Sequence, residues 1–168
     1  MAFRIKIEFE GIPQEFRGGN PRLVIIEEML RGVNEADVLV KNVMVANTPF
    51  GGTGLTRDGW LVQPARATIG KVVGRVVNPT PAAAVLESGA RPHHPPVGPD
   101  PALGVWIRRT LRISSPKKIR QKAFEIGAAF KRRGIRKRRI FSRAFRGVEP
   151  FVRAVLEIAA GRVVKRLG

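Results

Sequence analysis

The chain contains no cysteine and no tyrosine, and its 168 residues include only 2 histidines. Without cysteine, disulfide bridges and thiolate metal sites are excluded. Aromatic residues make up 7% of the chain, so a core has to be built mainly from Val, Ile, Leu and Ala. No apolar run approaches the roughly 18 to 20 residues that cross a bilayer as a helix, and we expect no membrane partner.

Acidic residues are also scarce. The chain has 13 Asp and Glu against 31 Lys and Arg, which gives a net charge of +18. The excess is concentrated, because residues 1–100 carry 11 basic and 10 acidic side chains, whereas residues 101–168 carry 20 and 3. A basic half of this kind is typical of a surface that meets nucleic acid or an acidic protein. Since like charges repel, we expect this charge to be matched within an assembly.

Residue periodicity in the first half predicts a strand, a long helix and two further strands. Residues 1–10 alternate apolar and charged side chains, as a half-buried strand does. Short strands are predicted near 60–63 and 68–78, and the second has apolar residues on both faces, which indicates cover on both sides. Residues 22–46 form the predicted helix, with one apolar face made of Met29, Val33, Ala36, Val40 and Val43.

Helices are predicted throughout the second half, at 82–88 and 102–112 and beyond. Ser115 followed by Pro116 is a favourable helix start, and Gly134 is expected to end that helix. Residues 135–147 are expected to form a basic connecting segment. Glu149-Pro150 is then expected to open a last helix that continues to about Leu167.

These elements predict an α+β fold. A small antiparallel or mixed sheet is expected to pack against the long N-terminal helix and the C-terminal helices. The pattern shows no internal repeat and no linker, so we expect a single domain of residues 1–168. Its part from about 102 to 168 is helical and basic.

The densest run of positive charge lies near the C-terminal end. It contains no acid and interleaves Phe141 and Phe145. Arginine suits two-pronged contacts to phosphate or carboxylate groups, so the run is a candidate contact for DNA or for an acidic partner. A solvated basic face is the alternative. The nine cations are Lys131, Arg132, Arg133, Arg136, Lys137, Arg138, Arg139, Arg143 and Arg146.

Candidate catalytic, cofactor and metal sites are weak. The glycine-rich stretch 48–55 lacks the Gly-Lys-Ser/Thr ending of a phosphate-binding loop, so we interpret it as a structural loop. His93 and His94 are adjacent in a Pro-rich stretch, where neighbouring side chains point in opposite directions and further ligands are missing. No paired acids and no nucleophile with a base are apparent. We therefore expect no cofactor, no metal and no enzymatic activity.

The order of the motifs carries a family resemblance. A predicted helix ends at Thr48-Pro49, and Thr53-Gly54-Leu55 follows it. After a valine-rich strand come Glu87-x-Gly89, a Pro-rich loop and C-terminal helices. This order resembles the neck and tail-completion proteins of long-tailed bacteriophages, such as minor tail protein Z of lambda. The best-matching positions are Thr48, Pro49, Thr53, Gly54, Leu55, Glu87 and Gly89.

The resemblance implies a structural virion protein that joins head and tail or completes the tail top. Such a subunit would belong to a homo-oligomeric ring, expected to be hexameric, around the DNA channel. Its partners would be head-completion, tail-terminator or tail-tube proteins, with non-specific contact to phage DNA. It would reside in the virion, and in the host cytoplasm during assembly. The matching positions, together with His93 and His94, would then form intersubunit or partner contacts.

A second hypothesis stays open beside the first. The basic C-terminal third is also compatible with a cellular nucleic-acid-binding protein of ribosomal or chromatin type. The two hypotheses differ in assembly, because the first predicts a ring and the second a monomer or dimer. The second also predicts binding to free nucleic acid that weakens steeply with salt.

Overall fold

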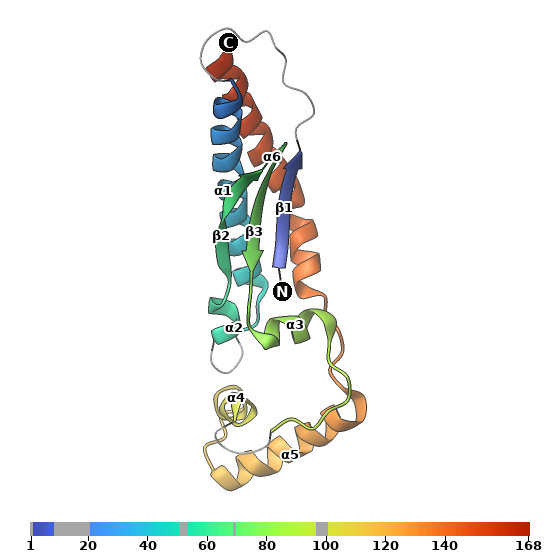
Figure 1. The fold of residues 1–168 in the computed structure, drawn as a ribbon. Helices are drawn as coiled ribbons and strands as arrows, with labels where there is room; N and C mark the ends of the chain where they lie inside the picture. Colours follow the sequence, from blue (N-terminus) through green and yellow to red (C-terminus); the bar gives the residue numbers. More distant parts are fainter. Residues whose placement is uncertain (1, 9–20, 51–53, 69, 97–100) are drawn as a thin grey trace. The chain divides into compact units, whose positions relative to one another are not determined.

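Helices and strands occur together as the sequence predicted, and the fold is α+β (Figure 1). The structure is a computed structural model, and it describes residues 2–8, 21–50, 54–68, 70–96 and 101–168. The chain divides into two compact units, and the single domain expected for residues 1–168 stays a prediction. Unit 1 consists of Met1–Val45, Trp60–Asn78 and Arg143–Gly168, and unit 2 consists of Ala46–Gly59 and Pro79–Ser142.

The division into units has no counterpart in a linker. The chain passes from one unit to the other after Val45, Gly59, Asn78 and Ser142, and none of these points stands in a long Pro- or Gly-rich spacer. Each unit is therefore assembled from separate stretches of sequence. The basic C-terminal part that was predicted as one block is shared, because residues 143–168 belong to unit 1.

Unit 1 contains a three-stranded antiparallel sheet in the order β1-β3-β2 (Figure 1). The strands are β1 (Ala2–Glu8), β2 (Leu61–Thr68) and β3 (Lys71–Val77). β2 is longer than predicted, and its pairing with β3 shifts register between Gln63 and Arg66. The side chains of β1 lie outside the described part, so the expected half-buried alternation of residues 1–10 stays a prediction.

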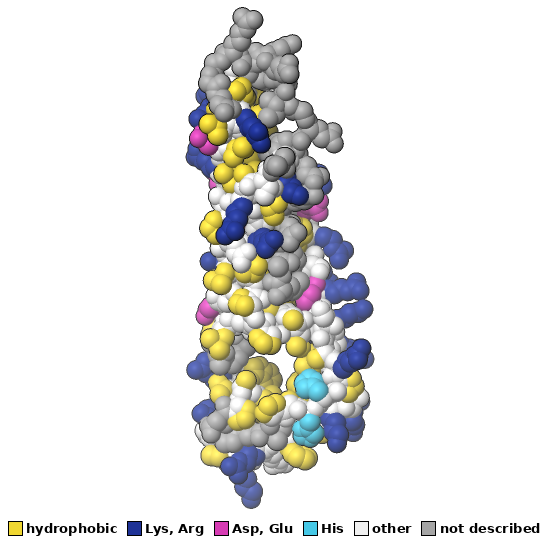
Figure 2. Space-filling view, in the orientation of Figure 1, with side chains coloured by type: hydrophobic (Ala, Val, Ile, Leu, Met, Phe, Trp, Pro, Cys, Tyr) yellow, Lys and Arg dark blue, Asp and Glu magenta, His cyan; other side chains and the backbone are white. Residues whose placement is uncertain are grey.

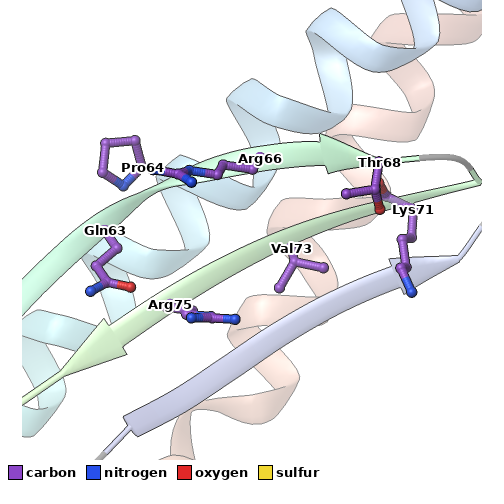
Figure 3. Close-up of a pocket in the computed structure, with 7 residues that line it drawn as sticks. All are labelled: Gln63, Pro64, Arg66, Thr68, Lys71, Val73 and Arg75. Carbon is purple, nitrogen blue, oxygen red and sulfur yellow. The ribbon is translucent and has the colours of Figure 1, made fainter.

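The central strand β3 is packed against a helix on one face. Val72, Gly74 and Val76 are buried, whereas Lys71 is half-buried and Arg75 is exposed. The expectation of cover on both sides was wrong, because the opposite face presents an exposed Arg75 and half-buried Lys71, Val73 and Val77. In two views, α1 and α6 run along the same face of the sheet (Figures 1 and 3).

Helix α1 (Pro21–Asn47) confirms the predicted N-terminal helix. Four of the five residues predicted for its apolar face are buried, and Val43 is half-buried. Gly32 does not split the helix. A methyl group at Gly32 would lie 2.5 Å from Ala159 Cβ, so the glycine allows α6 to approach α1 closely.

Helix α6 (Ile140–Leu167) begins ten residues before the predicted start at Pro150. Pro150 lies inside the helix instead of opening it, which corrects the expectation from Glu149-Pro150. Phe141, Ala144 and Val148 are buried, and their spacing extends the apolar face of α6 toward its N-terminus. Burial of this extra face explains why the helix continues through a residue that removes one backbone hydrogen bond.

Ion pairs connect the two long helices of unit 1. Arg162 of α6 contacts Glu28 at 3.0 Å and Glu35 at 3.2 Å, and Arg166 contacts Glu28 at 2.8 Å. The Arg166 hydrogen bond holds the pKa of the Glu28 carboxyl below its usual range. Part of the positive charge of the C-terminal part is thus neutralised by acids of α1.

Asp37 is a buried charge on the sheet-facing side of α1. It has no exposed surface, and neither carboxylate oxygen accepts a hydrogen bond of ordinary geometry. Burial raises the pKa of Asp37 to about 6, and the nearby Arg75 backbone amide offsets part of that rise. Gly74 faces this carboxylate, and a methyl group there would overlap with Asp37 Oδ2.

Unit 2 is largely helical. Its helices are α2 (Leu55–Asp58), α3 (Pro81–Ser88), α4 (Ala102–Thr110) and α5 (Pro116–Arg133). α4 and α5 pack on a small core of Ile107, Ile119 and Ala123, which half-buried apolar side chains surround. In the described ranges, no helix of either unit is long and apolar enough to cross a membrane.

Candidate functional site

Residues 134–139, here called the basic connector, join α5 to α6 within an ordered backbone. The Ala90 amide donates to the Ile135 carbonyl oxygen at 2.9 Å, and the Ile135 amide donates to the Ala90 carbonyl oxygen at 2.8 Å. Further on, the Arg138 amide donates to the Leu86 carbonyl oxygen at 3.2 Å. These bonds fasten the basic connector to residues 86–90, which the sequence analysis had singled out for a different reason.

Two glycines make this pairing possible. Gly89 has a φ of 77° and Gly134 a φ of 65°, a region that other residues rarely adopt. A methyl group on Gly89 would overlap with the Ile135 carbonyl oxygen, and one on Gly134 would overlap with the Ala90 carbonyl oxygen. The glycine of the Glu87-x-Gly89 motif is therefore required by a contact inside the chain.

Glu87 of the same motif caps helix α6. Its carboxylate accepts a hydrogen bond from the Phe141 amide at 3.0 Å and from the Ser142 amide at 3.3 Å. The Ser142 hydroxyl also donates to it. A carboxylate at a helix N-terminus satisfies unpaired amides and complements the helix dipole. Glu87 thus offsets the unfavourable position of several cations just before and within the first turns of α6.

The nine cations predicted as a contact surface are spread over three elements. Three occupy the last turn of α5, four the basic connector and two the first turns of α6. All nine side chains are exposed, and none forms an ion pair or a side-chain hydrogen bond with another described residue. Arg139 also has a φ of 50°, so the backbone is strained where the basic connector enters α6.

The structure adds further cations that the sequence analysis did not assign to a surface. Every Lys and Arg of unit 2 is exposed, and Figure 2 shows such side chains projecting from the surface near the two histidines. The sequence does not reveal them as one surface, because they are spaced along helices and do not form a run. The additional cations are Arg57, Arg91, Arg108, Arg109, Arg112, Lys117, Lys118, Arg120 and Lys122.

Only three acids lie among the described residues of unit 2, and Asp58 is exposed. Glu125 is taken by Lys122 at 2.8 Å on α5, and Glu87 is occupied by the amides of α6. Cations in the last turn of α5 complement the helix dipole, but those of the basic connector have no such local partner. The arrangement is therefore suited to holding an external polyanion rather than to acid–base or nucleophilic chemistry.

The predicted loop positions differ in their placement. Thr48 is buried, Pro49 is exposed, and Thr53 lies outside the described residues. Gly54 is buried with a φ of 77°, and its amide donates to the Phe50 carbonyl oxygen at 3.1 Å. Leu55 is 68% exposed at the start of α2. The loop thus combines a tight turn with apolar side chains at the surface.

One hollow brings the predicted loop and the basic connector together. It has a volume of about 480 Å³ and lies entirely within unit 2. Pro49 of the loop and Trp106 of α4 line it, and Arg136 and Arg138 border it. An apolar hollow with two arginines is suited to a side chain of a partner rather than to a nucleotide.

His93 and His94 are exposed and lie against α5. The His93 ring stacks on Phe130 with 6.2 Å between ring centroids, and its Nδ1 lies 2.9 Å from the Arg91 carbonyl oxygen. The His94 ring meets Phe124 edge-on at 6.5 Å. Among the residues whose placement is described, no group of three or more His, Asp or Glu could hold a metal ion.

Comparison with protein-family models, with curated proteins and with solved structures finds no match for this chain. The functional assignment therefore depends on the chain's own sequence and surface.

Proposed function

We propose that this chain is a structural subunit of the neck or tail-completion region of a long-tailed bacteriophage. In this role it joins head and tail, or completes the tail top, as part of a ring around the DNA channel. The observation that carries the proposal is the exposed basic cluster of Lys131–Arg146, which has an ordered backbone and no acidic partner among the described residues.

The character of this surface supports a binding role. Because hydrogen bonds already fix the backbone of the basic connector, binding does not have to order that backbone, and more of the electrostatic attraction is retained. Arginine and lysine side chains dominate the described part of this surface, which favours phosphate or carboxylate contact without sequence recognition. This is what a channel or docking surface in a DNA-containing particle needs.

In the proposed ring, the partners of each subunit compensate the high positive charge of the chain. Copies with a net charge of +18 repel one another unless a polyanion or acidic neighbours lie between them. In the proposed assembly, phage DNA or acidic faces of head-completion, tail-terminator or tail-tube proteins supply that charge. A closed cyclic ring, expected to contain six copies, is also a common way to satisfy a repeated interface.

A cellular nucleic-acid-binding protein of ribosomal or chromatin type is the second candidate, and the same basic surface favours it. The two candidates are separated by measuring mass in solution and in the native particle. A monomer or dimer that binds free duplex DNA, from a gene without portal or tail genes beside it, would support the second candidate and contradict the first.

The contact surface itself is tested by removing charge from the basic connector. The test variant replaces Arg136, Lys137, Arg138 and Arg139 with Gln. The control variant removes the same charge at scattered positions outside unit 2, with Arg22, Lys41, Arg153 and Lys165 changed to Gln. Circular dichroism and thermal melting verify that both variants fold.

Binding of a labelled DNA duplex is then followed by fluorescence anisotropy over a range of salt concentrations. Each lost phosphate contact should reduce the slope of log K against log salt by about 0.9, so the test variant should lose about 3 to 4. The control should change much less. In a phage that carries the gene, the test variant should also lower the yield of joined particles. Unchanged joining and DNA delivery would show that the cluster is only a solvated face.

A further inference from the structure

The outward face of the sheet in unit 1 contains a second cationic hollow, far in sequence from the basic cluster. Its volume is about 620 Å³, and Figure 3 shows its side chains arranged over β2 and β3. The cations among them are Arg66, Lys71 and Arg75, and the described lining residues include no acid. The remaining lining residues are Gln63, Pro64, Thr68 and Val73.

The hollow follows from the strand pattern. Because Val72, Gly74 and Val76 are buried, the intervening residues of β3 turn to the opposite face. On β2 the register shift between Gln63 and Arg66 places Pro64 in an irregularity of the strand. A proline in that position lacks the amide that a regular ladder requires. The irregular strand leaves space beside the cationic row of β3.

The charge on this face has no partner among the described side chains. Arg66, Lys71 and Arg75 form no ion pair there, and Arg66 is paired in register with Val73, between the other two. Lys71 and Arg75 are four residues apart on one strand, which corresponds to roughly 13 Å. β1 adds register partners of mixed charge, with Arg4 opposite Arg75 and Glu8 opposite Lys71.

We propose that this sheet face binds the phosphodiester backbone of duplex DNA. The row of cations is too long for a single phosphate group but matches a run of phosphates. The lining side chains that the structure describes include no aromatic ring, so they provide no base stacking of the kind that holds single strands. Among the described lining residues only Val73 and Pro64 are apolar, which is little for the buried core of a protein interface. Gln63 and Thr68 add neutral donors.

This site does not rest on the neck assignment, since any duplex-binding role of the chain would use it. The test variant is Arg66→Gln, Lys71→Gln and Arg75→Gln in the full chain. The control removes the same charge from the same unit, with Arg22, Lys41 and Lys165 changed to Gln. DNA binding of both variants is measured with the basic connector intact and again with its four cations replaced. This comparison distinguishes binding through the sheet face from binding through the basic connector.

The probes are a labelled 20-base-pair duplex, inorganic phosphate and poly-glutamate. We expect the test variant to reduce the salt slope for duplex by about 2 to 3 and the control by less than about 1. Inorganic phosphate should compete only weakly. The proposal is overturned if the intact chain does not bind duplex at low salt, or if test and control variants lose the same amount. It is also overturned if poly-glutamate binding falls while duplex binding stays unchanged.

Discussion

Replacing Asp37 with Asn would measure what a buried carboxylate costs this fold. Asp37 lies on α1 against Gly74 of β3, without exposed surface and without a hydrogen-bond partner of ordinary geometry. Ionisation there has to occur away from water, which is unfavourable. Asparagine keeps the shape of the side chain and removes the charge, so the substitution isolates the ionisation.

The magnitude follows from the pKa of Asp37, which is about 6 in the folded chain and 3.8 for an ordinary Asp. A difference of about 2 units corresponds to about 3 kcal/mol of unfolding free energy. Because the folded pKa is raised, this stability is fully present below about pH 3.8 and is lost as pH rises through about 6. The wild-type chain therefore loses stability from this group between those values, whereas Asp37→Asn does not.

The assay is urea unfolding of both proteins at several pH values from about 4.5 to 7.5. As pH rises across that range, the unfolding free energy of Asp37→Asn relative to that of the wild type should increase by roughly 2 kcal/mol. Any cost of burying the asparagine amide does not change with pH. Glu157→Gln, an exposed carboxylate of α6, controls for the loss of one negative charge in a basic protein. A difference between Asp37→Asn and wild type that does not change with pH would refute the reasoning.

Two other side chains give sharp tests of the contacts described above. Glu87→Ala removes the cap of α6 and should lower the unfolding free energy by about 1 to 3 kcal/mol, compared with little change for Glu125→Gln in an exposed pair. Equal effects in the two variants would contradict the cap. Glu28→Gln should destabilise the chain at neutral pH, because Arg166 lowers the pKa of Glu28. The stability that ionised Glu28 contributes is present above about pH 4.5 and is lost as pH falls. If Glu28→Gln were still less stable than the wild type in acid, the ion pairs would not explain its effect.

Much of the fold was predictable because its signals are local. The buried face of α1 follows from apolar residues three and four apart, such as Val33, Ala36 and Val40. The bounds of α5 follow from Ser115-Pro116 at its start and Gly134 at its end. Each of these signals lies within a few residues of the structure that it specifies.

The errors have a common physical origin in distant contacts. The start of α6 was missed because its cap, Glu87, lies 54 residues before Phe141. Pro150 was therefore taken as the first turn, although burial of Phe141 and Val148 extends the helix past it. In the candidate site, the run of cations was visible in the sequence, but its attachment to residues 86–90 depends on pairing that no local pattern reveals.

The way in which the chain passes between the units affects the order in which they are completed during synthesis. Unit 2 is contained within residues 46–142, whereas unit 1 needs residues 143–168 in addition to its first stretch and its sheet. On a ribosome, the strongly basic unit 2 thus has all its residues before α1 can meet its partner helix. The contacts of Gly32 with Ala159 and of Glu28 with Arg162 cannot form until the last part of the chain has emerged. Unit 2 can therefore be completed before unit 1, although unit 1 contains the N-terminal residues.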